Sequence, residues 1–478
     1  MIKPTFYWHD YETWGVDPRR DRPAQFAGVR TDWELNIIGE PLMCYCRPSD
    51  DVLPQPDACL VTGITPQKAE REGLCEAEFI ARIHAELAAP GTCGVGYNSI
   101  RFDDEVTRFA LYRNLYDPYA REWKSGNSRW DIIDMVRLTR ALRPEGIEWP
   151  EREEGVPSFR LEELTVANGI AHAAAHDALS DVHATIAMAR LIRKHQPRLY
   201  NFVLEHRTKQ AAARLLDLNA QQPVLHVSGM FPARFGSIAM VAPVARHPTN
   251  QNGLIVYDLR YDPEPLLTLE AEEVRRRVFT AANDLKEGEE RIPLKTVHLN
   301  KCPVLVPMNT LTPEAAERWE IDVAQGWAHL ERIQAARGLA LKIQEVHRQR
   351  EFDEAGDPDL NLYGEGFFSD EDRRRMEEAH RLSPAELGSF HPRFDDPRLP
   401  EMLFRYRARN WPETLTGEEL ARWNAFRQRR LNDQDGGGSI TLERYRQRLA
   451  ALRVERGDDA AALAIVEQLA EWGDRVAV

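Results

Sequence analysis

The chain has 478 residues, 43% of them hydrophobic, and a formal net charge of −14 at pH 7. This length exceeds one ordinary domain and predicts about three, and the acidic balance excludes a general attraction to nucleic acid, so a nucleic-acid site must be a local basic groove. The six scattered cysteines indicate reduced thiols, no run of about 18 apolar residues exists, and the first residues lack the apolar core of a signal peptide. We therefore expect a cytoplasmic protein that does not span a membrane.

The first region, residues 1–195, alternates strand-like and helical patterns and is expected to be an α/β domain. The strand-like runs cover 5–11, 35–46 and 92–97, and the helical patterns cover 76–88 and 103–114. Two more helices are predicted after them. The first starts with Ser158 as its N-cap and stops at Asn168 and Gly169, and the second runs from near Asp177 to Lys194.

The rest of the chain has a different pattern. A helical segment, 199–216, leads into short strands between 223 and 310 that are separated by Pro, Gly and Asn turns, which predicts a small β barrel. Helices are expected over 313–348, and a polar, turn-rich stretch follows before a region that is all helical except for 434–439. The predicted domains are 1–195, 196–350 with the barrel and its flanking helices, and 367–478, with a linker over 351–366.

Two carboxylates, Asp10 and Glu12, lie in the first predicted strand, FYWHDYET. Residues i and i+2 of a strand point to the same face, so the two side chains converge. A buried pair of like charges is unstable unless a cation lies between them, which indicates a divalent metal. For such a pair taken alone, an exposed strand face is the alternative.

Three further residues point to the same site. Asp103 follows a predicted strand and enters a helix, where open α/β sheets place functional groups, although an acid that stabilises the helix N-terminus would have the same position. Its neighbours Asp104 and Glu105 are expected to be solvated. Asp181 lies one turn inside the helix that starts near 177, and His176 lies in the loop before it.

These side chains together have the composition of a hydrolytic metal site. Carboxylates from three segments can hold two Mg²⁺ ions, which prefer oxygen ligands and stabilise an in-line phosphoryl displacement. A histidine with a pKa near neutrality can take the proton from the attacking water. The residues therefore indicate metal-dependent phosphodiester hydrolysis.

The pattern of Asp-x-Glu, an intermediate Asp and His-x4-Asp resembles the DEDDh family of 3′→5′ exonucleases. The stretches HDYETWG, VTGITPQ, RFDDEVTR, PSFRLEELTVANGI, HVSGMF and LFRYRARNWP, spread over essentially the whole chain, resemble bacterial exonuclease I. The resemblance implies an α/β ribonuclease-H-like exonuclease domain, an SH3-like β barrel and a C-terminal all-helical domain. It also implies Mg²⁺-dependent, processive removal of 5′-mononucleotides from the 3′ end of single-stranded DNA, with a role in DNA repair and recombination.

The resemblance also assigns roles to residues by position. The implied metal ligands and general base are Asp10, Glu12, Asp103, Asp181 and His176, in that order. Glu12 and Arg160 are implied to bind the substrate. Two Mg²⁺ ions are expected per active site, and Mn²⁺ is expected to substitute. Besides single-stranded DNA, the implied partner is the acidic C-terminal tail of single-strand DNA-binding protein, and we expect a monomer in the bacterial cytoplasm.

Single-stranded DNA that is bound without sequence preference needs cations for its phosphates and aromatic faces for its bases. Residues 108–143 interleave the two, and the expected contacts in the chain are Arg108, Tyr119, Trp123, Arg137, Lys209, Asn252 and Lys301. In the alternative, half of the aromatic side chains of 108–143 are core, and half of its arginines pair with Glu122, Asp131 and Asp134. A second basic segment, 404–430, could close over the strand or simply solvate helix faces.

Two other functions remain open at this point. A non-catalytic nucleic-acid-binding protein with a degenerate nuclease site would lack at least one of the five motif residues, and all five are present. An RNA 3′-exonuclease would share the same site chemistry. No residue in the sequence visibly senses or excludes a 2′-hydroxyl, so the preference for DNA rests on the resemblance alone.

Overall fold

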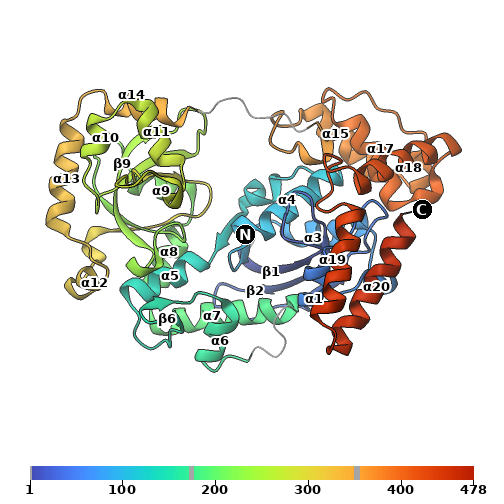
Figure 1. Cartoon of the computed structure of the whole chain (residues 1–478), viewed down its shortest axis with the longest axis horizontal. Coiled ribbons are helices and arrows are strands. Elements are labelled where there is room, and N and C mark those ends of the chain that lie inside the picture. Colours follow the sequence, from blue (N-terminus) through green and yellow to red (C-terminus); the bar gives the residue numbers. More distant parts are fainter. Residues whose placement is uncertain (1–2, 172–176, 349–355, 478) are drawn as a thin grey trace. The chain divides into compact units, whose positions relative to one another are not determined.

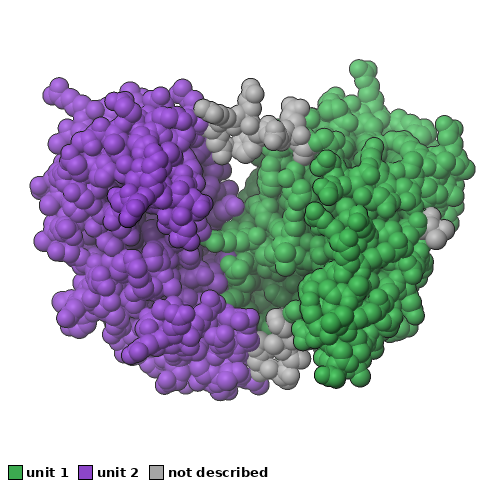
Figure 2. Space-filling model, in the orientation of Figure 1, with its two compact units in different colours: residues 1–129, 172–186, 353–478 green, residues 130–171, 187–352 purple. Residues whose placement is uncertain are grey.

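The computed structural model describes residues 3–171, 177–348 and 356–477. The chain divides into two compact units, which Figure 2 distinguishes by colour. The first unit contains residues 1–129, 172–186 and 353–478, and the second contains residues 130–171 and 187–352. The first unit therefore combines the beginning of the chain with its end.

A five-stranded sheet supports the first unit (Figure 1). Its strands are β1 (Thr5–Thr13), β2 (Pro23–Thr31), β3 (Leu42–Tyr45), β4 (Thr92–Gly96) and β5 (Ser128–Asp131), in the order β3-β2-β1-β4-β5. The central strand β1 is antiparallel to β2 and parallel to β4. The described helices α3 (Glu76–Leu87) and α4 (Asp103–Arg113) share a core with Tyr7 and Tyr11 of β1. Because side chains alternate along a strand, Asp10 and Glu12 point to the opposite face.

Two predictions in this region were wrong. Strand β2 was not predicted, because it is buried on both faces and its sequence, PAQFAGVRT, shows no alternation of polar and apolar residues. The predicted strand over 35–46 shrinks to β3, because Leu35 and Gly39 have left-handed backbone conformations, with φ of 69° and 76°, that interrupt an extended chain.

Five further helices belong to this region. They are α1 (Pro56–Thr62), α2 (Pro66–Glu72), α5 (Ile133–Leu142), α6 (Leu161–Ala167) and α7 (Ala178–His195), with a short hairpin of β6 (Glu151–Glu153) and β7 (Val156–Pro157) between α5 and α6. Of these helices, α6 and α7 were predicted and α1, α2 and α5 were not. The N-cap of α6 is Arg160 and not the predicted Ser158. The reason is that Ser158 directly follows β7, and its hydroxyl accepts a hydrogen bond from the Arg160 N–H at 3.4 Å.

The second unit contains the predicted barrel strands. They are β8 (Val224–Val227), β9 (Ile238–Arg246), β10 (Gly253–Asp258), β11 (Leu294–His298) and β12 (Val304–Pro307), in the order β11-β10-β9-β8-β12. The predicted helix over 199–216 is two helices, α8 (Pro197–His206) and α9 (Lys209–Leu215), because the Thr208 side chain caps a new N-terminus. The other helices of this unit are α10 (Glu264–Thr268), α11 (Ala271–Phe279), α12 (Pro313–Arg318), α13 (Val323–Ala335) and α14 (Leu339–His347).

The C-terminal part is helical, as predicted. It contains α15 (Asp370–Ala379), α16 (Pro384–Leu387), α17 (Leu399–Asn410), α18 (Gly417–Asn432), α19 (Leu442–Glu455) and α20 (Ala460–Val476). Helices α19 and α20 pack against α1, where Trp14, Tyr445 and Trp472 share one core. None of the helices in the described residues is both long and apolar enough to cross a membrane.

The arginines of segment 404–430 are of two kinds: Arg422 and Arg429 are exposed on α18, as the solvated-face alternative expects, whereas others are buried. Arg405, Arg407 and Arg430 are buried, with 2–5% of their surface exposed. Arg405 pairs with Asp359 at 3.0 Å and Arg430 with Asp357 at 3.3 Å, so their charges are already neutralised inside the first unit. A buried guanidinium requires such a partner, which explains why they do not solvate helix faces.

Candidate active site

The carboxylates of β1 lie where two parallel strands end. Strand β4 pairs with β1 only from Thr5 to Trp8, so Asp10 and Glu12 lie beyond the last paired residue. On the other side, β2 continues alongside them and places Gln25 opposite Glu12. Functional groups of open α/β sheets collect at this edge, beyond the carboxyl ends of the strands.

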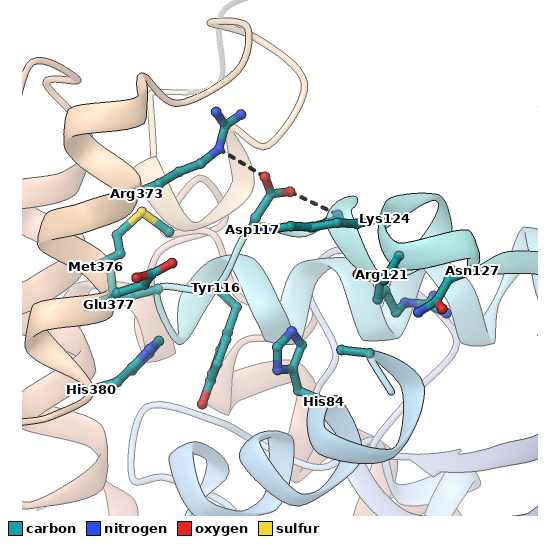
Figure 3. Close-up of a pocket in the computed structure, with 14 residues that line it drawn as sticks. His84, Tyr116, Asp117, Arg121, Lys124, Asn127, Arg373, Met376, Glu377 and His380 are labelled. Carbon is teal, nitrogen blue, oxygen red and sulfur yellow. Dashed lines mark hydrogen bonds and ion pairs between the residues drawn. The ribbon is translucent and has the colours of Figure 1, made fainter. Parts of the chain in front are cut away.

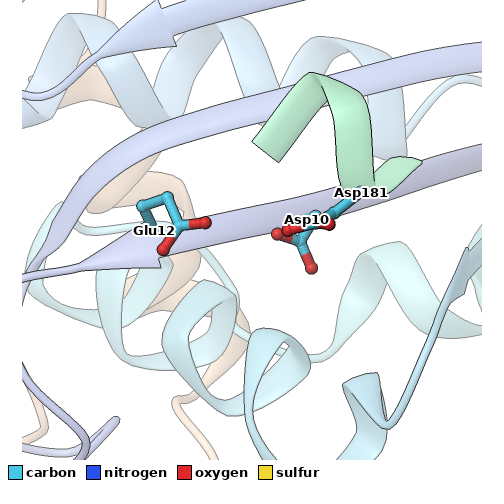
Figure 4. A group of neighbouring side chains, drawn as sticks. All are labelled: Asp10, Glu12 and Asp181. Carbon is cyan, nitrogen blue, oxygen red and sulfur yellow. The ribbon is translucent and has the colours of Figure 1, made fainter. Parts of the chain in front are cut away.

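Asp181 joins this pair from the first turn of α7. One ligand oxygen from each of Asp10, Glu12 and Asp181 lies within 4.8 Å of the others (Figure 4). Glu12 is buried, with 9% of its surface exposed, whereas Asp10 and Asp181 are partly exposed. The sequence prediction that these three carboxylates converge is therefore confirmed.

Asp103 reaches β1 from the N-terminus of α4. Its carboxylate accepts a hydrogen bond from the Tyr11 N–H at 3.1 Å, which fixes it beside the strand segment between Asp10 and Glu12. The Thr107 hydroxyl donates to the Asp103 carbonyl at 2.8 Å and so anchors the first turn of the helix. Asp103 is buried and contributes to the electrostatics of the cluster, although it lies outside the group of three convergent ligands.

The charges of these carboxylates oppose one another. Burial, followed by the charges of Asp103, Glu12 and Asp181, raises the pKa of Asp10 well above its usual value. Burial, followed by the charges of Asp181, Asp103 and Asp177, raises the pKa of Glu12 from 4.5 to about 8. Without a cation, the cluster therefore retains protons at neutral pH. An all-oxygen donor set with excess negative charge fits a hard divalent cation.

Gln25 is a site residue that sequence reasoning missed. Its side-chain N–H donates to the Asp177 carboxylate at 3.3 Å, and its carbonyl oxygen accepts from the Ala178 N–H at 3.4 Å. These bonds hold the start of α7, and hence Asp181, against β2. Gln25 could be recognised as a site residue only once β2 was known, because its role depends on its position opposite Glu12.

Asp104 is not solvated, as the sequence analysis expected, but only 2% exposed. It pairs with Arg121 at 2.6 Å and with Arg129 at 3.0 Å. Burial alone would raise its pKa, but the two guanidiniums hold the pKa of Asp104 well below its usual value. The prediction was wrong because α4 is covered on nearly all sides, so two consecutive acids can both point inward.

The general base predicted from the sequence, His176, lies outside the described residues. Its role therefore stays a prediction from the His-x4-Asp motif. The described structure begins again at Asp177, and Asp181 follows it in the convergent cluster.

The predicted DNA contacts of the first unit differ in their surroundings. Arg108 is 6% exposed, pairs with Glu122 and Glu105 at 2.7 Å each, and lies over the Tyr119 ring at 5.3 Å. The alternative of an arginine paired with Glu122 is therefore realised at this position. Trp123, in contrast, is 67% exposed.

The remaining predicted contacts lie in the second unit. Arg137 pairs with Asp134 at 2.6 Å and lies over the Phe159 ring. Arg160 is exposed and pairs with Glu162 at 2.7 Å. Lys209 is the exposed first residue of α9, Asn252 lies in the turn before β10, and Lys301 is exposed after β11.

Two exposed aromatic side chains beside Tyr119 were not among the predicted contacts. Tyr363 is 58% exposed and Phe367 is 77% exposed. Their rings lie 6.5 and 5.4 Å from that of Tyr119. Sequence reasoning placed Tyr363 in a linker and Phe367 at the start of the helical domain, so their proximity to Tyr119 could be found only from the fold.

Comparison with known proteins gives a consistent result over the whole chain. Family models match as "Exonuclease" over residues 7–189, "Exonuclease I SH3-like domain" over 207–349 and "Exonuclease I C-terminal domain" over 356–476. The exodeoxyribonuclease I of Escherichia coli strain K12 is 46% identical over 473 residues, which cover 99% of this chain and 98% of that relative.

Solved structures agree with the family models. An exonuclease I from Methylocaldum szegediense matches with a TM-score of 0.96 and 56% identity, and covers 99% of this chain and 100% of that chain. The zinc-bound form of an E. coli exonuclease I complex with single-stranded DNA matches with a TM-score of 0.94 and 45% identity, with the same coverage. The predicted order of a ribonuclease-H-like exonuclease domain, an SH3-like domain and a helical domain is confirmed. The chain therefore belongs to the exonuclease I family of enzymes.

Proposed function

We propose that this protein degrades single-stranded DNA from its 3′ end, processively and with Mg²⁺, and releases 5′-mononucleotides. The observation that carries the proposal is the convergence of Asp10, Glu12 and Asp181 within 4.8 Å at the edge of the sheet. Its substrate follows from the relatives, one of which is a complex with single-stranded DNA.

The cofactor is proposed to be two Mg²⁺ ions, for which Mn²⁺ can substitute. Asp10, Glu12 and Asp181 would hold the ions, and Asp103 would complete the set. The raised pKa values of Asp10 and Glu12 support this assignment, because like charges at this density need a cation. When bound, the ions supply charge stabilisation to the phosphate and activate the attacking water. The bound zinc of the E. coli complex supports a metal site in the family.

The protein's own residues would orient the reacting groups and accept the proton of the attacking water. His176 would accept the proton of the water that attacks the terminal phosphodiester. The bond between phosphorus and the O3′ atom then breaks, the O3′ atom takes up a proton, and a nucleoside 5′-monophosphate leaves. Glu12 and Arg160 would contact the terminal nucleotide.

Bound single-stranded DNA is proposed to use both cationic and aromatic side chains. The proposed contacts are Arg108, Tyr119, Trp123, Arg137, Lys209, Asn252 and Lys301. Exposed rings bind bases without sequence preference, because every base has a π-face. Trp123 fits this role through its exposure, and Tyr363 and Phe367 offer two further exposed rings beside Tyr119.

The biological setting is proposed from the family. We infer a role in DNA repair and recombination, a monomer in the bacterial cytoplasm, and docking of the acidic C-terminal tail of single-strand DNA-binding protein. We also propose domain boundaries at 1–195, 196–350 and 367–478, with a linker over 351–366. The family-model matches over 7–189, 207–349 and 356–476 support this division into three, although the third match begins inside the proposed linker.

A panel of end-labelled oligonucleotides tests the proposal. Single-stranded DNA, single-stranded RNA and duplex DNA of one sequence would be digested with Mg²⁺, each labelled in turn at the 3′ and the 5′ end. Rapid loss of the 3′ label from single-stranded DNA alone is expected. Preferred digestion of RNA would agree with the proposed hydrolytic chemistry but would contradict the proposed preference for DNA. Binding without any digestion would favour the non-catalytic alternative.

A further inference from the structure

A cavity of about 370 Å³ lies away from the carboxylate cluster, between α3, the segment after α4 and α15 (Figure 3). All of its lining residues belong to the first unit. Its volume is in the range of small-molecule sites, and it is too small for an oligonucleotide. Neither the metal site nor the proposed DNA contacts use it.

A row of three rings forms one wall of this cavity. The Tyr116 ring lies between those of His84 and His380, with centroid distances of 4.5 and 4.0 Å (Figure 3). Burial, together with His380 and Arg121, lowers the pKa of His84 to about 4, and burial also lowers the pKa of His380. One ring nitrogen of His380 is bound to the Asn114 carbonyl at 2.9 Å. Both imidazoles are thus neutral at pH 7, and a neutral imidazole has one donor and one acceptor.

Basic groups line other parts of the same cavity. The Lys124 ammonium is exposed and forms no ion pair with any carboxylate in the described part of the chain. Arg121 is 3% exposed, and its Nε atom is buried without a hydrogen-bond partner among the described residues. Its guanidinium is already paired with Asp104 at 2.6 Å, so Lys124 is the cation of this cavity that a ligand can reach. Arg373 on the rim is already paired with Asp117 at 3.0 Å.

We propose that this cavity binds a nucleoside 5′-monophosphate. The phosphate would meet Lys124, and the base would meet the polar edges of His84 and His380. An anion alone would leave the imidazole edges unused, and a neutral nucleoside would leave Lys124 unpaired. The proposal rests on the proposed function, because the molecule is of the class that the exonuclease reaction releases.

The cavity is connected to the catalytic strand through Arg121. This side chain pairs with Asp104 at 2.6 Å, and Asp104 adjoins Asp103. A ligand in the cavity, which Arg121 lines, is therefore one ion pair away from the residues that flank the metal site. The site would let the enzyme bind its own product without occupying the DNA path.

Equilibrium dialysis of labelled dAMP against the full chain tests the proposal. The buffer contains EDTA, because the metal-free carboxylate cluster repels a phosphate and leaves only other sites to bind it. Saturable binding is expected. Ala88→Phe, which fills the cavity, and Lys124→Gln, which removes its free cation, should each weaken it at least about tenfold. Lys286→Gln, which changes an exposed side chain outside the cavity, should bind dAMP as the wild type does.

Three outcomes would overturn the site: no saturable binding by the wild type, unchanged binding by Lys124→Gln and Ala88→Phe, or equal binding of inorganic phosphate or deoxyadenosine alone. Lys124 is exposed, so its replacement tests the site even if Ala88→Phe fails to fold. The failure of the proposed function would be seen separately, as a lack of oligonucleotide digestion with Mg²⁺.

Discussion

The carboxylate of Glu12 is the clearest case of a site residue that lowers the stability of the folded protein. It is 9% exposed, and its neighbours Asp181, Asp103 and Asp177 are all acidic. A residue chosen for stability would not be a carboxylate here. The arrangement is explained by a ligand that brings positive charge, and strand β1 supplies two of the ligands because its alternation presents positions 10 and 12 on one face.

This charge arrangement predicts a pH-dependent stability in metal-free buffer. The ordinary pKa of Glu12 is 4.5, and it is about 8 in the folded protein. Between these pH values the folded protein keeps a proton that the unfolded chain has released, so the free energy of unfolding falls as pH rises from 4.5 to about 8.

Glu12→Gln should remove this effect. Above pH 8 its free energy of unfolding should exceed that of the wild type by about 1–3 kcal/mol, and below pH 4 the two should agree. Urea unfolding in EDTA measures the difference. Equal slopes with pH for both proteins would show that Glu12 does not carry the raised pKa.

The general base gives a second prediction at this scale. His176→Ala should bind single-stranded DNA as the wild type does and lose most turnover, by about 10²–10⁴-fold, which is the usual contribution of a general base. His183→Ala, which removes an exposed histidine of α7, is the matched control. Full turnover by His176→Ala would mean that another group accepts the proton.

The sequence identified these residues because their pattern is local. Asp10 and Glu12 share a strand face, and Asp181 has a fixed place in the first turn of a helix. Asp104 and Gln25 could not be identified in this way. Whether an acid is solvated or buried depends on which distant arginines meet it, and for Asp104 these are Arg121 and Arg129.

At the scale of elements, two distant segments form one aromatic surface. The segment after α4 contributes Tyr119, and the segment before α15 contributes Tyr363 and Phe367. Trp123, four residues after Tyr119, is a further exposed ring of the first segment. Arg108 contacts both segments, because its guanidinium lies over the Tyr119 ring and donates a hydrogen bond to the Tyr363 hydroxyl oxygen at 3.2 Å. Three of these rings are more than half exposed, which is unusual for side chains without a ligand.

We expect this surface to stack on the bases of bound DNA. Trp123→Ala and Phe367→Ala should each weaken the binding of a single-stranded oligonucleotide by about 1–3 kcal/mol, with little dependence on its sequence. Fluorescence anisotropy at one salt concentration measures the change. Phe279→Ala, which removes an equally exposed ring from the second unit, is the control. Unchanged affinity in both variants would exclude stacking at this surface.

At this scale too, sequence reasoning found the features that depend on a local pattern and missed those that depend on the fold. Helices with one apolar stripe and the short barrel strands were predicted, because their periodicity is visible locally. Strand β2 was missed because both of its faces are buried. The aromatic surface was only half identified, since its two segments are separated by more than 200 residues and their contact depends on the fold.

At the scale of the whole molecule, buried ion pairs join the beginning of the chain to its end. Asp51 and Asp359 are both 1% exposed, and Arg409 contacts both. Arg22 extends the group by pairing with Glu76 at 3.0 Å. Neighbouring guanidiniums hold the pKa of Asp359 well below its usual value, although burial acts in the opposite direction. The described part of the predicted linker thus contributes a buried charge and does not act only as a tether.

Removing one charge from this buried group should lower the free energy of unfolding far more than removing one charge from an ion pair on the surface. Asp359→Asn leaves Arg405 and Arg409 without their shared partner and should lower the free energy of unfolding of the first unit by about 3–5 kcal/mol. Asp474→Asn removes a pair with Arg446 that is largely exposed and should cost less than about 1 kcal/mol. Denaturant unfolding compares the two. Similar values for both would mean that the buried pair is not needed for stability.

The most direct test of the proposed active site is a single-turnover assay of Asp181→Asn. The release of the 3′-terminal nucleotide from single-stranded DNA and the binding of that DNA would be measured in the same samples over a range of Mg²⁺ concentrations. Asp284→Asn, an exposed acid in the second unit, is the control. We expect Asp181→Asn to bind DNA and release no nucleotide at any Mg²⁺ concentration. Release at the rate of the wild type would contradict the assignment of the carboxylate cluster as the catalytic metal site.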